Sequence, residues 1–185
     1  ETGVAKRILK ETFPYTASEF LAWTSMRVDI LLLAAILGEQ AAGLYSPAVS
    51  LANALFLVPA AIYTVILPVL SSLYGSYPRQ AWRTAMRSLG LLFMVGLGLS
   101  FFLFWTSPFL ISILGESFSA SKDVLRILSS ILLVHSLTFG MAAILVAIKQ
   151  QARRTVIQAI AVGINILLNL YVIPRYGILG AAWVY

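Results

Sequence analysis

The chain has 185 residues, of which 60% are hydrophobic and only 11% are charged. Soluble domains average about 45–50% apolar and about 25% charged residues, so this composition excludes a sizeable soluble domain and indicates a chain that crosses a membrane several times. The sequence contains no cysteine, which excludes disulfides, thiolate zinc sites and cysteine nucleophiles. A net charge of +6 suits nucleic acid, but positive cytoplasmic loops are the commoner cause in membrane chains, and we expect no nucleic-acid partner.

Five apolar segments reach the ~20 residues that a helix needs to cross the hydrocarbon layer. They cover 14–37, 47–73, 88–114, 125–148 and 155–173, and a sixth starts at 178–185. Because the runs are continuous rather than alternating, we expect an all-α, polytopic transmembrane helical bundle over 14–185. Residues 1–13 are predicted to be a cytoplasmic juxtamembrane segment. There is no initiator Met and the chain stops within an apolar run, so we expect a fragment of a longer protein.

Turn residues separate the predicted spans. They are Gly38 with Gly43, the segments 75–78 and 115–121, and the segment 174–177.

The basic residues predict the orientation of these spans. One side of the predicted topology carries nine of them: Lys6, Arg7, Lys10, Arg79, Arg83, Arg87, Lys149, Arg153 and Arg154. The other side carries three: Lys122, Arg126 and Arg175. Because short cytoplasmic loops are enriched in Lys and Arg, we expect the N-terminal end in the cytoplasm.

The first span contains two charges at membrane depth, Arg27 and Asp29. Such charges are costly in lipid and usually face protein or a wet cavity. At ~100° per residue the two side chains point about 200° apart, so they cannot pair with each other. Partners should therefore come from other spans. A fixed cation at mid-depth attracts an anionic headgroup such as a phosphate, whereas Asp29 suits either a structural bond between helices or a role in ion coupling.

Two further spans carry polar stripes at helical spacing. The stripe in 47–73 consists of Ser46, Ser50, Asn53, Ala60, Thr64, Pro68 and Ser71. This stripe is equally consistent with a helix packed among its neighbours and with a helix that lines a cavity. The stripe in 155–173 consists of Gln158, Ala161, Asn165 and Asn169. Its three amides should not face acyl chains; they either hold helices together or line a polar lumen that binds sugar hydroxyls.

Two other spans carry features that favour packing. His135 is the only histidine, and we expect it to be a packing residue rather than a ligand or proton carrier. The spacing of Gly96 and Ser100 permits close approach of two helices.

Enzyme motifs are absent: there is no HExxH, no glycine-rich phosphate loop and no GxSxG. We expect neither catalysis nor a cofactor.

Two stretches resemble a known family. The first reads RVDILLL from Arg27, LG from Leu37 and GLYSPA from Gly43; the second reads NILLN from Asn165 and IPRYGILGAA from Ile173. In order and spacing they resemble polysaccharide flippases of the Wzx type, within the multidrug/oligosaccharidyl-lipid/polysaccharide exporter superfamily. The resemblance extends over nearly the whole chain, from about residue 13 to residue 185.

The resemblance implies half of a two-bundle transporter, with this chain holding helices seven to eleven and the start of twelve. It implies a flippase that moves a polyprenyl-pyrophosphate oligosaccharide across the bacterial cytoplasmic membrane. The expected partners are this lipid-linked oligosaccharide, the membrane lipids and a first helical bundle of the same protein. The expected substrate-cavity residues are Arg27, Asp29, Asn53, Gln158, Asn165 and Asn169. The two bundles would rock against each other around the cavity.

Three alternatives remain open at this stage. A drug or small-cation exporter of the same superfamily should have an acidic or aromatic cavity. A non-transporting scaffold subunit should bury all its polar stripes against protein. A membrane glycosyltransferase or polymerase should have a large outer loop with clustered charges, whereas the longest such loop here is about 115–124.

Overall fold

The computed structural model describes residues 2–185, and the side chains among them except those of 2–11, 14 and 116. The helices in chain order are α1 (Thr2–Leu37), α2 (Glu39–Ser76), α3 (Pro78–Leu114), the short 3₁₀ helix η1 (Glu116–Phe118), α4 (Ser121–Ala147) and α5 (Gln151–Val184). No strand occurs between residues 2 and 185. The expected all-α transmembrane bundle is therefore confirmed.

Five helices are long and apolar enough to cross a membrane, with Tyr15–Leu37 as the spanning part of α1. Many large apolar side chains point outward from them, including Phe101 and Trp105 on α3, at 66% and 68% exposed. Water would not tolerate so much exposed apolar surface, whereas lipid solvates it.

The helices extend further than the sequence pattern predicts, and the turns are shorter. Gly43 lies inside α2, and only Gly38, with φ 88°, separates α1 from α2. Pro78 is the first residue of α3, where its missing N–H is no loss. The last turn lies at Gly177, whose φ of 62° and ψ of −142° reverse the chain inside α5. The segment 178–185 therefore continues in a new helical direction after this reversal. Likewise α1 begins before residue 14, so the backbone is helical on both sides of the predicted boundary at 13/14.

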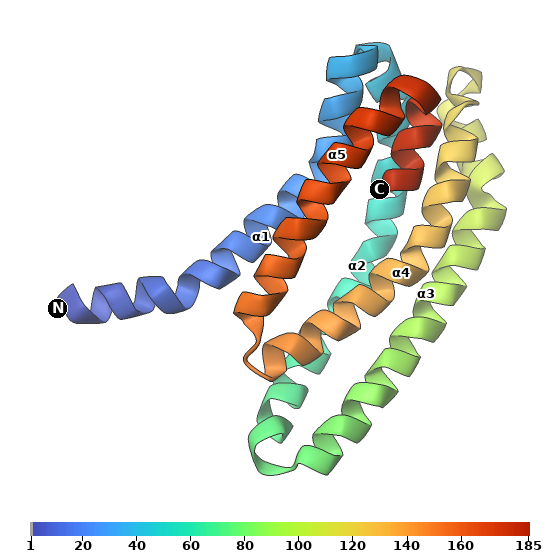
Figure 1. Ribbon diagram of the computed structural model, residues 1–185. Helices are drawn as coiled ribbons and strands as arrows, with labels where there is room; N and C mark the ends of the chain where they lie inside the picture. Colours follow the sequence, from blue (N-terminus) through green and yellow to red (C-terminus); the bar gives the residue numbers. More distant parts are fainter. Residues whose placement is uncertain (1) are drawn as a thin grey trace.

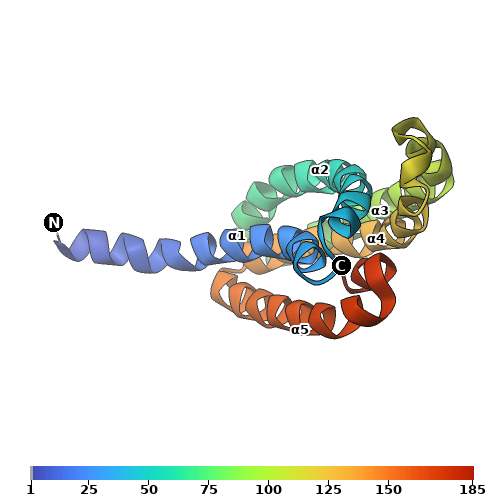
Figure 2. The same ribbon diagram turned by 90° about the horizontal axis from the view of Figure 1, so that it is seen from above.

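Figure 1 shows α1 and α5 rising side by side, while α2, α3 and α4 form a second group. Viewed from above in Figure 2, α1 lies between α2 and α5, and the C-terminal end lies among the helix ends. The main core is made of apolar side chains from all five helices, among them Leu33, Tyr45, Leu103, Leu128 and Ile173.

Helices α3 and α4 approach closely at Gly96. A Cβ atom there would lie 2.7 Å from Cβ of Ser136 and 3.0 Å from Cα of Leu133. The close approach predicted from this glycine is confirmed. At the neighbouring Gly98 a Cβ atom would meet nothing within 4 Å, so only one face of α3 requires a glycine.

Candidate polar site between the spanning helices

Arg27 and Asp29 lie on opposite sides of α1, as their spacing predicts. Asp29 is 1% exposed, whereas Arg27 is exposed. Both lie within the spanning part of α1, Tyr15–Leu37, well away from its ends. One charge is thus buried in the bundle and the other projects from it.

Asp29 is held by the amide stripe of α5. Nδ2 of Asn169 donates a hydrogen bond to Oδ1 of Asp29, and Asn169 is 0% exposed. The same Nδ2 also donates to Oδ1 of Asn165 at 3.2 Å. Asn165 in turn donates through its own Nδ2 to the carbonyl oxygen of Val184 at 3.0 Å. The stripe therefore ties α5 both to α1 and to the segment beyond Gly177.

Three oxygen atoms beside this network have no hydrogen-bond partner among the described residues. They are Oδ2 of Asp29, Oδ1 of Asn169 and Oη of Tyr45, all buried. Tyr45 is 0% exposed and interacts electrostatically with Asp29. Unpaired buried oxygens are costly, and a carboxylate is the most costly of them unless it gains a proton or a cation. Among the described side chains no group of three His, Cys, Asp or Glu residues could hold a metal ion.

A second contact between the same helices lies nearer their N-terminal ends. Oγ of Ser18 donates to Oε1 of Gln158 at 2.7 Å. Both this pair and the Asp29–Asn169 pair are 140 residues apart in sequence. A constant offset means that α1 and α5 run in the same direction, which requires an even number of membrane crossings between the start of α1 and the start of α5.

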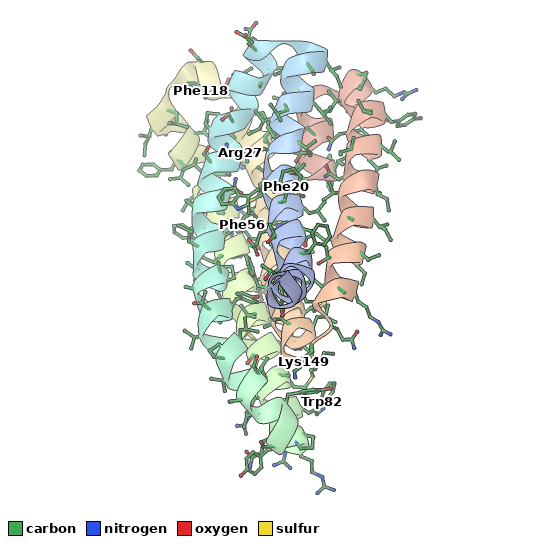
Figure 3. The ribbon with its side chains drawn as sticks, turned by 90° about the vertical axis from the view of Figure 1, so that its left-hand side faces the viewer. Phe20, Arg27, Phe56, Trp82, Phe118 and Lys149 are labelled. Carbon is green, nitrogen blue, oxygen red and sulfur yellow. The ribbon has the colours of Figure 1, made fainter. Side chains whose placement is uncertain are left out.

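Arg27 faces the side of the bundle where α1 meets α2. Figure 3 shows it between these two helices, in the upper part of the view. No hydrogen bond or ion pair joins Arg27 to any side chain that the structure describes, but its charge acts on Tyr185. Oη of Tyr185 donates to Oδ1 of Asn53 at 2.8 Å. Tyr185 and Asn53 thus form a polar pair that connects α2 to the C-terminal segment, and the charges of both Asp29 and Arg27 act on Tyr185.

His135 of α4 is packed between two aromatic rings. Its ring stacks on Phe56 with centroids 4.4 Å apart and planes 9° apart, and on Tyr185 at 6.2 Å and 26°. This is the packing role expected for a lone histidine, here through ring stacking. It also fixes the ring of Tyr185, whose hydroxyl group holds Asn53.

Part of the polar stripe of α2 lies away from the packed face of the helix. Ser50, Thr64 and Ser71 are exposed, whereas α2 buries residues such as Ala48, Ala52 and Phe56. Packing against the helices of this chain therefore does not explain these three residues. The amides of α5 differ, since each of them bonds to α1 or to the segment beyond Gly177, whereas the hydroxyl group of Thr64 bonds to the carbonyl oxygen of Ala61 on its own helix.

Sequence reasoning missed Ser18, Tyr45 and Tyr185. Ser18 lies 11 residues before Asp29, and Gln158 lies 11 residues before Asn169. Eleven residues are about three turns, so each pair shares one helix face, and this matched spacing was a readable signal. Tyr45 and Tyr185 gave no such signal: the place of Tyr45 depends on how α2 packs against α1, and that of Tyr185 on the chain reversal at Gly177.

The comparison with protein families finds a match to the MatE family model over residues 14–171. The comparisons with curated proteins and with solved structures find no match.

Proposed function

Since the chain belongs to the MatE family and is a multi-pass membrane transporter of the multidrug/oligosaccharidyl-lipid/polysaccharide exporter superfamily, we propose that its substrate is a lipid-linked oligosaccharide. The protein flips a polyprenyl-pyrophosphate repeat unit across the bacterial cytoplasmic membrane. The N-terminal end of the chain lies in the cytoplasm, and the exposed polar face meets a first helical bundle of the same protein.

Arg27 supports this proposal more than any other residue. It is a guanidinium in the middle of a spanning helix, exposed and without a carboxylate partner among the described side chains. A fork of donors with no counter-charge suits the phosphate oxygens of a pyrophosphate. A drug or small-cation exporter would repel its own substrate with this group.

The other polar residues divide into two roles. Asn53 and the exposed hydroxyl groups of the α2 stripe line the path of the sugars. Asn165, Asn169 and Gln158 hold α5 in place, and through Asn169 they position Asp29. The unpartnered oxygen of Asp29 binds a proton or a sodium ion, and this ion couples the movement of the bundles to the ion gradient.

The decisive experiment replaces Arg27 in the full-length protein. In a strain lacking the chromosomal copy, Arg27→Ala should lower export of the surface polysaccharide at least tenfold, while immunoblots show a normal membrane level. Arg27→Lys should retain part of the export, because it keeps the charge but not the planar fork. Arg175→Ala is the matched control, since this exposed arginine stacks on Tyr171 of its own helix. Normal export by Arg27→Ala would remove the pyrophosphate site.

A further inference from the structure

An apolar pocket lies at the end of the bundle where α2 turns into α3. It has a volume of about 210 Å³ and is walled by Leu70 and Tyr74 of α2, Ala81 and Trp82 of α3, and Ile144 and Ala147 of α4. Leu70 and Ala147 also belong to a small apolar core that is separate from the main one. The small side chains of Ala81 and Ala147 leave the space open, and Trp82 is 64% exposed.

A basic hollow of about 370 Å³ adjoins this pocket. Pro78, Arg79, Trp82 and Arg83 line it, and Pro78 and Trp82 line both spaces. Figure 3 shows Lys149 at the same end of the molecule as Trp82. Lys149 follows Ile148, another residue of the pocket wall.

The stretches of chain that form this basic hollow contain no acidic residue. The sequence contains no Asp or Glu between Glu39 and Glu116, and none after Asp123. The pocket and its rim come from the end of α2, the start of α3 and the end of α4, so they lie within these two acid-free stretches. The guanidinium groups of Arg79 and Arg83 are exposed, and neither has a carboxylate partner among the side chains that the structure describes.

The two spaces match the two parts of a phospholipid. The pocket walls are at the level where spanning helices end, and the α2–α3 turn continues past the end of α4 (Figure 1). A phospholipid passes from an apolar acyl chain through an interfacial region to a charged headgroup. The site has the same order, with the apolar walls of the pocket first, then Trp82 at the boundary, and then Arg79 and Arg83.

We propose that this end of the bundle holds an anionic glycerophospholipid. One acyl chain lies in the pocket between α2, α3 and α4, and Arg79 and Arg83 bind the phosphate-bearing headgroup. A zwitterionic lipid carries a cation that these arginines would repel, so the site selects phosphatidylglycerol over phosphatidylcholine. The inference requires only that the chain spans a membrane, and it does not depend on the proposed substrate.

The test uses the full-length protein, stripped of lipid and reconstituted with dibrominated phospholipids that quench tryptophan fluorescence on contact. The fluorescence of Trp82 is obtained by subtracting the emission of the Trp82→Phe variant from that of the wild type. Brominated phosphatidylglycerol should quench this signal at a mole fraction about tenfold lower than brominated phosphatidylcholine does, because each exposed arginine contributes measurably to binding of anionic lipid. The preference should shrink as salt rises.

Two variants locate the site. Arg79→Gln with Arg83→Gln should abolish the headgroup preference, and Ala81→Leu should fill the pocket and weaken quenching by both lipids. Lys122→Gln with Arg175→Gln removes the same charge from the opposite end of the bundle and should leave the preference unchanged. Equal quenching by the two lipids in the wild type would mean that Trp82 meets only the unselected lipid around the protein, and it would overturn the proposal. This measurement does not depend on the folding of any variant. A preference that survives loss of both arginines would overturn it as well.

Discussion

Asn169 donates a hydrogen bond to Asp29 from the far end of the sequence, and the same 140-residue offset links Gln158 to Ser18. The two pairs lie three turns apart along α1 and α5, so they fix the register of two parallel helices at two points. They also place a buried carboxylate against α5, while Arg27 on the other side of α1 projects toward α2. The separation of these two charges leads to the predictions below.

Asp29→Asn tests whether the carboxylate binds a coupling ion. The amide keeps the size of the side chain and an acceptor for Asn169, so thermal unfolding in detergent should change little. Transport in proteoliposomes should lose its dependence on a sodium or proton gradient, because an amide does not take up a proton and attracts a cation weakly. Asp29→Leu should instead lower the free energy of unfolding by about 1–3 kcal/mol, since it removes one acceptor of the buried Asn169 amide and leaves only the longer hydrogen bond to Asn165. Full ion dependence in Asp29→Asn would leave Asp29 with a structural role only.

The Ser18–Gln158 hydrogen bond should contribute modestly to the packing of α1 on α5. A double-mutant cycle with Ser18→Ala and Gln158→Leu should give a coupling of about 0.6 kcal/mol, the average for such bonds inside membranes. Unfolding in mixed detergent micelles measures it. Thr24→Val paired with Gln158→Leu is the control, because Thr24 bonds to the carbonyl oxygen of Phe20 on its own helix. A coupling as large in the control pair would mean that the cycle reports general loosening.

Gly96 and Gly98 should respond differently to the same added methyl group. Gly96→Ala places Cβ 2.7 Å from Cβ of Ser136, and overpacking of this kind costs about 1–3 kcal/mol. Gly98→Ala meets nothing within 4 Å and should be neutral or slightly stabilising. The melting temperatures of the two variants in detergent measure this difference in stability. Equal melting temperatures would contradict the close packing of α3 on α4.

The exposed stripe of α2 should be in contact with water. Single cysteines at Ser50 and Thr64 are expected to react with a membrane-impermeant thiol reagent in intact cells or in inverted vesicles. A cysteine at Asn169 should be protected in both, since that position is 0% exposed. A cysteine at Phe101, which is 66% exposed on α3, serves as the control for a lipid-facing position and should also stay unreactive. Protection of Ser50→Cys and Thr64→Cys in every condition would favour the scaffold alternative.

Much of the fold follows from the sequence because the bilayer allows few solutions. A run of ~20 apolar residues in lipid must satisfy its own backbone hydrogen bonds, and a helix does so within one segment. The five spans are predicted for that reason. Their ends were less predictable: Gly43 has turn chemistry yet lies inside α2, since a single glycine in the left-handed region at position 38 suffices to reverse the chain.

The sequence by itself determined that Arg27 and Asp29 point to opposite sides, because the geometry of one helix sets the angle between neighbours. It also determined that the amides of α5 form one stripe. Only the tertiary structure decided which side of α1 is buried, that Asn169 is the partner of Asp29, and that Tyr185 bonds to Asn53. Those relationships depend on which helices pack together and on the reversal at Gly177, and contacts between residues 140 positions apart leave no local pattern in the chain.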